Sequence, residues 1–177
     1  MSKPTLATVW LDGCSGCHMS LLDIDDRLIA LLERADLVYS PLVDAKIFPD
    51  MVDITLVEGS VSNEDDLAKI RHVRAHTTTL VSLGDCAVMA NVPGMRNIFS
   101  VDEVLRHAYY DTATHGAQTP NQVIPALLPR VRPVHSVVAV DVFVPGCPPS
   151  ADTIFAVLSD LLDGRIPDVG ALTRFGA

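Results

Sequence analysis

The chain has 177 residues, of which 49% are hydrophobic and 20% are charged. This length is typical of one domain that buries a core without disulfide bonds, so we expect a single domain over residues 1–177. The 22 acidic and 13 basic residues give a formal net charge of −9. No tract rich in Lys or Arg is present to neutralise phosphates, which excludes nucleic acid as the expected ligand. No apolar run approaches the roughly 18 residues that cross a bilayer, so we expect no membrane span.

The mean hydropathy of +0.31 is high for a chain without a membrane span. Such an excess of apolar residues predicts apolar surfaces that bind other proteins. The N-terminal segment Met1–Thr5 lacks the basic start and apolar stretch of a secretory signal and contains no twin arginine, so we expect a cytoplasmic protein. In that reducing compartment, the four cysteines are expected to bind metal or to carry out redox chemistry rather than to form structural disulfides.

The first half of the chain alternates between strand and helix patterns. The β-rich run Thr5–Leu11 predicts a first strand, and apolar residues at helical spacing predict a helix over Ser20–Leu32. Asp36–Tyr39 and Met51–Val57 predict two further strands, separated by an irregular connection over Pro41–Asp50.

The second half continues this alternation. Ser62 and Asp65 predict a capping box for a helix over Asn63–His76. Two buried-type strands and a final helix follow, at Thr78–Leu83, Val137–Val144 and Ala151–Leu162.

Between Asn91 and Arg132 the pattern weakens, because prolines and glycines interrupt it, and only Val101–Tyr109 is predicted to be helical. We expect this stretch to lie over one edge of the sheet or against a partner. Strands that alternate with helices predict an α/β fold with an open, mostly parallel, doubly wound sheet and helices on both faces.

The four cysteines fall just after predicted strands. Cys14 and Cys17 follow the first strand, Cys86 follows the fourth, and Cys147 follows the fifth. Because the carboxyl ends of parallel strands meet at one rim, thiolates far apart in sequence can converge there. Four thiolates at one point match the ligand set of a 4Fe-4S cluster, and neighbouring glycines let the backbone approach it closely. We therefore predict one 4Fe-4S cluster and an electron-transfer role.

Three other uses of these cysteines stay open. A structural zinc site would use the same thiolates, but such sites usually take their ligands as two close pairs, whereas Cys86 and Cys147 each stand alone. A free-standing thiol oxidoreductase would need only the Cys-x-x-Cys pair, Cys14 and Cys17, between a strand and a helix start. Finally, the cysteines could be apolar filler, which fits Cys86 best because apolar residues follow it.

Four motifs in order span nearly the whole chain, namely Asp12–His18 (DGCSGCH), Val57–Val61 (VEGSV), Gly84–Ala87 (GDCA) and Pro145–Pro149 (PGCPP). In this order they resemble the small subunits of nickel–iron hydrogenases, which have a flavodoxin-like domain. The related 20 kDa cluster-bearing subunit of complex I resembles this chain in its EG and PGCPP elements, but it typically has two adjacent cysteines in the first motif. The resemblance implies that the cluster proximal to the nickel–iron centre is bound by Cys14, Cys17, Cys86 and Cys147.

Within that family, a short chain without a twin-arginine leader or a further cysteine-rich domain looks most like the cytoplasmic, bidirectional NAD-linked hydrogenases. The resemblance then implies the reaction H2 + NAD+ → NADH + H+, run in either direction. It places the hydrogen-activating nickel–iron centre on a large subunit, and FMN, NAD and further iron–sulfur clusters on diaphorase subunits. This chain would conduct electrons between them and would be part of an enzyme, hydrogen dehydrogenase, only as a subunit. NADP or another acceptor stays open.

Two polar residues lie beside the predicted rim. Glu58 stands at a strand end, where its carboxylate could relay protons or bond to a partner; the alternative is an acid that satisfies backbone amides. His18 follows Cys17 directly and could donate to a cluster sulfur or contact the large subunit; the ordinary alternative is a routine hydrogen bond at a helix start.

Overall fold

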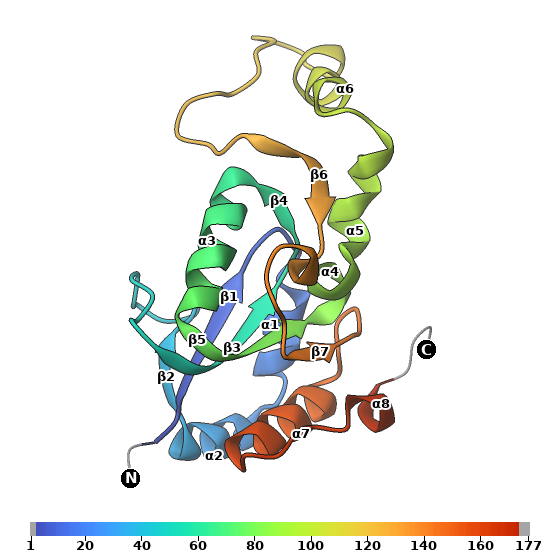
Figure 1. Cartoon of the computed structure of the whole chain (residues 1–177). Coiled ribbons are helices and arrows are strands. Elements are labelled where there is room, and N and C mark those ends of the chain that lie inside the picture. The colour runs from blue at the N-terminus through green and yellow to red at the C-terminus, as the bar shows by residue number, and fades with distance from the viewer. Residues whose placement is uncertain (1–2, 174–177) are drawn as a thin grey trace.

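A five-stranded sheet forms the centre of the computed structural model, with the strands in the order β2-β1-β3-β5-β7 (Figure 1). All neighbouring strands in it are parallel. Their bounds are β1 Thr5–Trp10, β2 Asp36–Tyr39, β3 Val52–Glu58, β5 Thr77–Leu83 and β7 Val142–Val144. The structure describes residues 3–173; residues 1–2 and 174–177, the two ends of the predicted domain 1–177, lie outside the described residues.

Helices cover both faces of the sheet, because successive side chains of a strand point to opposite faces. On one face, Leu56 of β3 belongs to a core cluster with side chains from α1, α2 and α7. On the other face, its neighbour Val57 belongs to a cluster with side chains from α3 and α4. These helices are α1 Gly16–Leu22, α2 Asp26–Arg34, α3 Glu64–Ala75, α4 Gly84–Met89 and α7 Ala151–Leu162. The predicted α/β fold with a mostly parallel sheet is confirmed.

The predicted final helix is also confirmed, since α7 spans Ala151–Leu162. A short helix, α8 (Val169–Leu172), packs beside it, and Thr153 Oγ1 donates to the carbonyl of Leu172 at 3.0 Å. None of the helices in the described part of the chain combines the length and the apolar character that crossing a bilayer requires.

The prediction of one helix over Ser20–Leu32 is wrong, because α1 ends at Leu22 and α2 begins at Asp26. Asp25 has a φ of 59° between them, and Ile24 turns into the core with 1% of its surface exposed. Burial of Ile24 stabilises the fold by roughly 1.5–3 kcal/mol, which offsets a backbone strain of about 1–3 kcal/mol. The apolar periodicity runs through the break because α1 and α2 face the same core cluster.

The capping box predicted for α3, Ser62 with Asp65, does not form. Asn63, rather than Ser62, caps the helix, and its Oδ1 accepts the N–H of Asp66 at 2.9 Å. Asp66 in turn accepts from both the N–H and the hydroxyl of Ser62. The carboxylate that accepts hydrogen bonds at the start of α3 is therefore that of Asp66, and not that of the predicted Asp65.

The predicted strand over Val137–Val144 is shortened to β7, Val142–Val144. The residues before it follow a short 3-10 helix, η3 (Val134–Ser136), in which Val134 is fully buried. Val137, Val138 and Val140 pack against the same core cluster as Val134. The apolar run thus reflects packing of irregular backbone and not strand pairing.

Residues 91–132 form an arm that reaches beyond the end of the sheet, with α6 and the loop after it at the top of Figure 1. Its last strand, β6, pairs antiparallel with β4 (Val61–Asn63), a pairing that the sequence pattern did not predict. The predicted helix over Val101–Tyr109 is an α-helix, α6, only over Val101–Arg106. It continues as a π-helical segment, η2, over His107–Asp111. The arm contains α5 Asn91–Gly94, η1 Met95–Ile98, α6 Val101–Arg106, η2 His107–Asp111 and β6 Leu127–Arg132.

Two side chains of η1 fix the base of the arm. Asn97 exchanges two hydrogen bonds with the backbone of Val131, at 2.9 and 2.8 Å. Arg96 donates from Nη2 to the carbonyls of Ser62 and Leu128, at 2.9 and 3.0 Å. The arm is therefore held to the β4–β6 pair by specific polar contacts and is not a loose connection.

Candidate four-cysteine site

Three segments at the carboxyl ends of β1, β5 and β7 carry the four cysteines. Cys14 precedes α1 and Cys17 lies in its first turn; Cys86 lies in α4, directly after β5, and Cys147 lies in the loop after β7. Because β1, β3, β5 and β7 are successive neighbours in the sheet, these segments meet at one rim, as predicted. Cys17 is buried, Cys86 is half-buried, Cys14 and Cys147 are exposed, and all are free thiols.

The cysteines are close enough to perturb one another. Burial raises the pKa of Cys17 well above its ordinary value, and the charges of Glu58 and of the other three cysteines raise it further. Burial also raises the pKa of Cys86, against the effect of a hydrogen bond from the backbone N–H of Val92. A thiolate at Cys17 or Cys86 therefore needs nearby positive charge, which a bound metal supplies.

Two glycines let these segments approach one another. Gly84 has a φ of 81°, and a Cβ on it would lie 2.2 Å from the Cys17 sulfur. Gly146 has a φ of 139°, and a Cβ on it would lie 2.6 Å from the backbone of Pro149. A side chain at Gly84 would push the segment after β5 away from Cys17, and one at Gly146 would distort the loop that carries Cys147.

Asp85 ties the segment after β5 to the loop after β7. Its backbone N–H donates to the carbonyl of Gly146 at 2.8 Å, and its Oδ1 accepts the N–H of Gly146 at 2.7 Å. Ser20 of α1 donates to the carbonyl of Pro149 at 2.6 Å and so ties α1 to the same loop. Neither Asp85 nor Ser20 was predicted to act here. The one signal for Asp85 is its place directly before Cys86.

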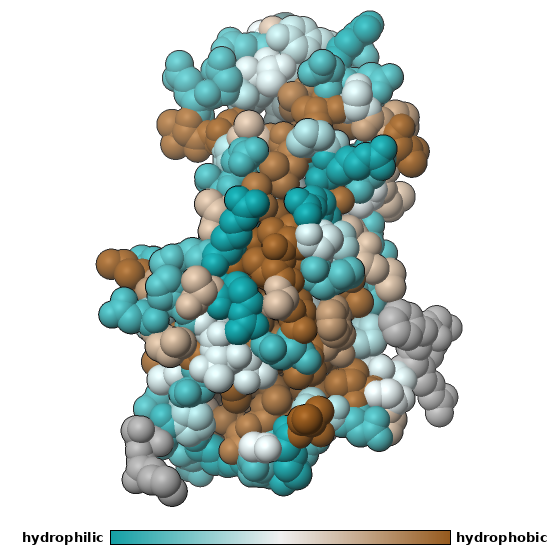
Figure 2. Space-filling model, viewed as in Figure 1, coloured by the Kyte–Doolittle hydropathy of each residue, from teal (hydrophilic) through white to brown (hydrophobic). Residues whose placement is uncertain are grey.

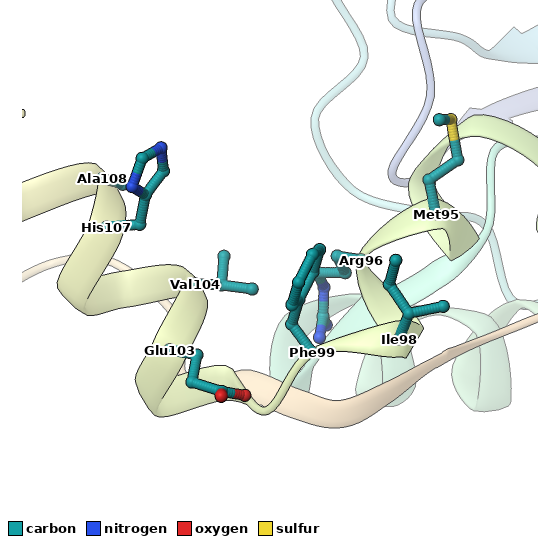
Figure 3. A pocket seen from close by; sticks show the side chains of 8 residues that line it. All are labelled: Met95, Arg96, Ile98, Phe99, Glu103, Val104, His107 and Ala108. Carbon is teal, nitrogen blue, oxygen red and sulfur yellow. The ribbon is translucent and has the colours of Figure 1, made fainter.

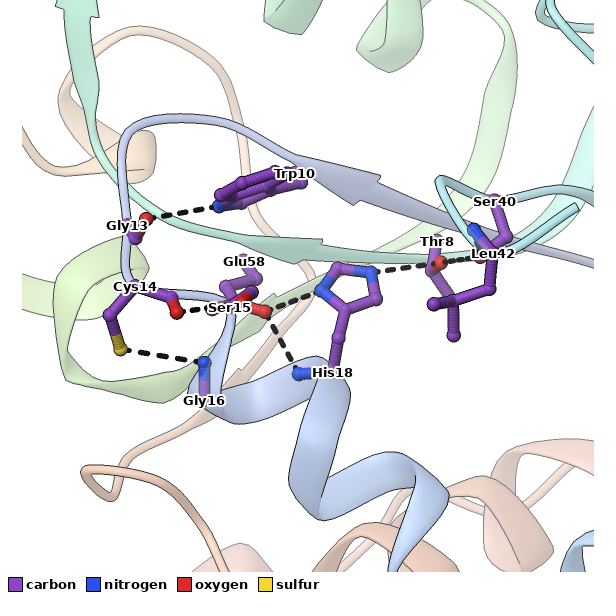
Figure 4. Close-up of polar contacts among 10 residues, drawn as sticks. All are labelled: Thr8, Trp10, Gly13, Cys14, Ser15, Gly16, His18, Ser40, Leu42 and Glu58. Carbon is purple, nitrogen blue, oxygen red and sulfur yellow. Dashed lines mark hydrogen bonds and ion pairs between the residues drawn. The ribbon is translucent and has the colours of Figure 1, made fainter.

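Besides Cys86, two further cysteines accept N–H hydrogen bonds on their sulfurs. The backbone N–H of Gly16 donates to Cys14 Sγ at 3.4 Å (Figure 4), and Nδ2 of Asn91 donates to Cys147 Sγ at 3.5 Å. Such donors stabilise negative charge on sulfur and are common around metal–thiolate groups. Sequence reasoning missed Asn91, because it lies five residues beyond Cys86 in a region without a clear pattern.

Glu58 and His18 form the buried part of the rim, with 2% and 4% of their surfaces exposed. Glu58 Oε2 accepts the backbone N–H of His18 at 2.9 Å and also contacts Nδ1 of its ring (Figure 4). Nε2 of the ring lies 3.0 Å from the hydroxyl of Thr8, which donates to Ser40 Oγ at 2.7 Å. Both ring nitrogens are therefore engaged, and the tautomer of the imidazole sets which atom donates in each contact.

This arrangement makes Glu58 a helix cap supplied from another element. The N-cap residue of α1, Ser15, has a φ of 63° and makes no side-chain cap hydrogen bond. His18 is the third residue of α1, and its otherwise free amide is satisfied by the Glu58 carboxylate. The first turn of α1, with Cys17 in it, is thereby fixed to the end of β3.

The same contacts decide between the expectations for His18. Both of its ring nitrogens are engaged inside the chain, by Glu58 and by Thr8, and the side chain is buried. These contacts favour the ordinary alternative, a routine hydrogen bond at a helix start, over a bond to a cluster sulfur or a contact with the large subunit. Glu58 accepts a backbone amide, as the alternative for it proposed, and its role in proton relay stays a prediction.

A pocket of about 720 Å³ lies in the arm, between η1 and α6 (Figure 3). Its walls come from Met95, Arg96, Ile98, Phe99, Glu103, Val104, His107 and Ala108. None of the four cysteines lines it. Because its walls are largely apolar, this pocket is suited to side chains of another protein rather than to the chemistry at the rim.

The residues at the rim fit a 4Fe-4S cluster. Among residues 3–173, no group of three or more His, Cys, Asp or Glu residues could hold a metal ion. A 4Fe-4S cluster binds each thiolate to a separate iron, so its ligands stand farther apart than those around a single ion. Four thiols, the close approach at Gly84 and the N–H donors to sulfur all fit such a cluster.

Residues 14–161 match the family described as NADH ubiquinone oxidoreductase, 20 Kd subunit, and the chain belongs to this family. It is 44% identical over 168 residues to the NAD-reducing hydrogenase HoxS subunit delta of Cupriavidus necator, a match that covers 92% of this chain and 80% of that protein. It also superposes on a chain of the crystal structure of an NAD+-reducing [NiFe]-hydrogenase in the H2-reduced state with a TM-score of 0.93. That match has 39% identity and covers 98% of this chain and 99% of the other.

A more distant relative is a vhu subunit of the F420-non-reducing hydrogenase of Methanocaldococcus jannaschii. It is 36% identical over 161 residues, which cover 90% of this chain and 56% of that protein. The chain thus spans little more than half the length of this relative. The resemblance to the small subunits of NAD-linked nickel–iron hydrogenases, predicted from four motifs, is confirmed by these matches.

We expect Asp85→Ala to loosen the loop that carries Cys147, because the N–H of Gly146 loses its acceptor. The free energy of unfolding should fall by about 1–3 kcal/mol, and the Cys147 thiol should react faster with a maleimide. Chemical denaturation and mass spectrometry of the labelled chain measure the two effects. Asp85→Asn keeps an acceptor oxygen and is the control. Equal stability and equal labelling of the parent, Asp85→Ala and Asp85→Asn chains would contradict the role of Asp85 in holding the loop that carries Cys147.

Two variants of Glu58 separate its role as a helix cap from a role in proton transfer. Oε2 of Glu58 makes both contacts, so Glu58→Gln with its amide oxygen in that place keeps an acceptor for the His18 amide and for Nδ1, and its stability should stay near that of the parent. Glu58→Leu should be destabilised by about 1–3 kcal/mol for each donor that loses its acceptor. Denaturation curves test this. A stable Glu58→Gln chain whose assembled enzyme loses turnover would instead support proton relay.

Proposed function

We propose that the chain is the electron-transfer small subunit of an NAD-linked nickel–iron hydrogenase, and that it holds one 4Fe-4S cluster through Cys14, Cys17, Cys86 and Cys147. The observation that carries this proposal is the convergence of four free cysteines from three segments at one rim of the sheet. A bound cluster supplies one-electron transfer. The residues of this chain supply the thiolates, exclude water around Cys17 and donate N–H groups to sulfur.

The similarity to the delta subunit of an NAD-reducing hydrogenase supports the reaction H2 + NAD+ → NADH + H+ for the assembled enzyme. In this proposal, hydrogen is activated at a nickel–iron centre on a large subunit. Diaphorase subunits carry FMN, further iron–sulfur clusters and the NAD site, and this chain conducts electrons between the two. A cytoplasmic location, where NAD is reduced and reoxidised, is part of the proposal.

The burial of Cys17 argues against a free-standing thiol oxidoreductase. Such a catalyst needs a thiol of lowered pKa that a substrate disulfide can reach. Burial instead raises the pKa of Cys17, and its sulfur lies against Gly84. A Cys14–Cys17 catalyst would also give no role to the hydrogen bonds by which Asp85 joins the segments of Cys86 and Cys147. A zinc-stabilised binding module remains the alternative that metal analysis must decide.

Exposed apolar side chains support a protein partner over the rim and the arm. Figure 2 shows hydrophobic residues gathered in a band along the length of one face of the molecule. Beside the cysteines, Met19, Met89 and Val92 are exposed, and the apolar surface continues along η1 at Met95 and Ile98. Large exposed apolar surfaces of this kind mark subunit interfaces. The large subunit is the proposed occupant, because the cluster must lie close to the nickel–iron centre for electrons to pass.

The central test is metal analysis of the complex purified without oxygen, followed by analysis of this chain after separation or reconstitution. Parent chain should contain about four irons and four acid-labile sulfides. A Cys→Ser change at any of the four positions should lower both, whereas serine at an exposed position such as Ala113 should not. Zinc without sulfide, or a metal-free chain whose activity needs only Cys14 and Cys17, would refute the proposal.

A second test concerns the partner surface. Ile98 is 81% exposed, and Ile98→Asp should leave folding intact while reducing the amount of nickel-containing large subunit that co-purifies with this chain by at least about tenfold, a cost of roughly 1.4 kcal/mol. Ile166 is 93% exposed and lies outside the arm, so Ile166→Asp is the matched control. Unchanged recovery of the large subunit with Ile98→Asp would place its interface elsewhere.

A further inference from the structure

We infer that Asn91 tunes the reduction potential of the cluster by donating a hydrogen bond from its side-chain amide to the sulfur of Cys147. This inference rests on the proposed function, since it assumes a cluster on the four cysteines. Asn91 Nδ2 lies 3.5 Å from Cys147 Sγ, which is within hydrogen-bonding distance for a sulfur acceptor. The amide belongs to α5, which is remote in sequence from the ligand that it contacts.

A strained turn brings this side chain to the rim. Ala90, between α4 and α5, has a φ of 68° and is only 5% exposed. A left-handed conformation costs a residue with a Cβ about 1–2 kcal/mol, so a buried alanine in this state must be held by its surroundings. The turn redirects the chain directly after α4, which carries Cys86. As a result, the side chain of Asn91 reaches Cys147, and the N–H of Val92 faces Cys86.

The Asn91 amide differs in its contacts from other asparagines of the chain. Asn97 and Asn63 both bond to backbone groups, where they anchor the arm and cap α3. Within residues 3–173, the Asn91 side chain makes no hydrogen bond other than the one to Cys147 Sγ. Its removal therefore breaks no hydrogen bond of the described residues besides the one to this sulfur.

The sign of the effect follows from the charge of the cluster. Reduction adds one negative charge, which spreads onto the cysteine sulfurs. An N–H dipole that points at a sulfur stabilises the reduced state more than the oxidised state, and so it raises the potential. Loss of the Asn91 donor should therefore lower the potential without any change in the number of ligands.

The test is an EPR-monitored redox titration of the holo-complex with Asn91→Leu beside the parent. At a fixed ambient potential, the ratio of oxidised to reduced cluster should rise by about threefold to tenfold, the equivalent of one neutral hydrogen bond. Tenfold corresponds to about 59 mV for a one-electron couple. Pulsed EPR after exchange into deuterated buffer should show that one exchangeable proton coupling is lost. Asn121→Leu, at an exposed position of the arm, is the control and should leave both readouts unchanged.

Each outcome decides one question. An unshifted potential in Asn91→Leu with full iron and sulfide refutes the inference and leaves the proposed function standing. If Asn91→Leu loses the cluster, Asn91→Ala repeats the titration without the bulk of leucine; loss of the cluster in both variants makes Asn91 a structural residue and overturns the tuning role. A parent chain without a 4Fe-4S signal refutes the proposed function itself.

Discussion

The parallel register of four neighbouring strands is the constraint on which the cysteine site depends. Trp10, Glu58 and Leu83 stand opposite one another as the last residues of β1, β3 and β5, and Leu83 is in turn opposite Val144, the last residue of β7. The segments that carry the cysteines thus leave the sheet from one row. A slip of one residue in any pairing would move a segment by about 3.3 Å and turn its side chains to the other face.

Hydrogen bonds then hold together the segments that the strand register brings close to one another. Asp85 joins the segments after β5 and β7, Ser20 joins α1 to the latter, and Glu58 caps α1 from β3. The bonds of Asp85 and Ser20 each restrict the relative position of two segments that carry cysteines, and the bond of Glu58 fixes the first turn of α1, with Cys17, to the sheet. These bonds consequently hold the segments that carry the cysteines in fixed relative positions.

The sequence predicted the elements that carry a regular pattern or a named motif. A mostly parallel sheet could be inferred because β-rich runs alternate with helices, and the cysteines could be placed because each group follows a strand. The break at Ile24 was invisible, since α1 and α2 face one core and keep one periodicity. The same holds for Val137–Val140, whose apolar side chains pack without strand pairing. Asp85, Ser20 and Asn91 were missed because their partners are set by tertiary contacts, which single-sequence patterns do not contain.

The turn at Ala90 has a consequence for how the protein behaves in isolation. The residues that follow it first place two N–H donors at the rim and then continue into η1, whose exposed apolar side chains belong to the proposed subunit interface. A displacement of the arm therefore also displaces those donors, because only a few residues separate them. On the proposed function, a partner that contacts the arm would also act on these donors, so the surroundings of the Cys86 and Cys147 sulfurs would differ between the separated chain and an assembled complex.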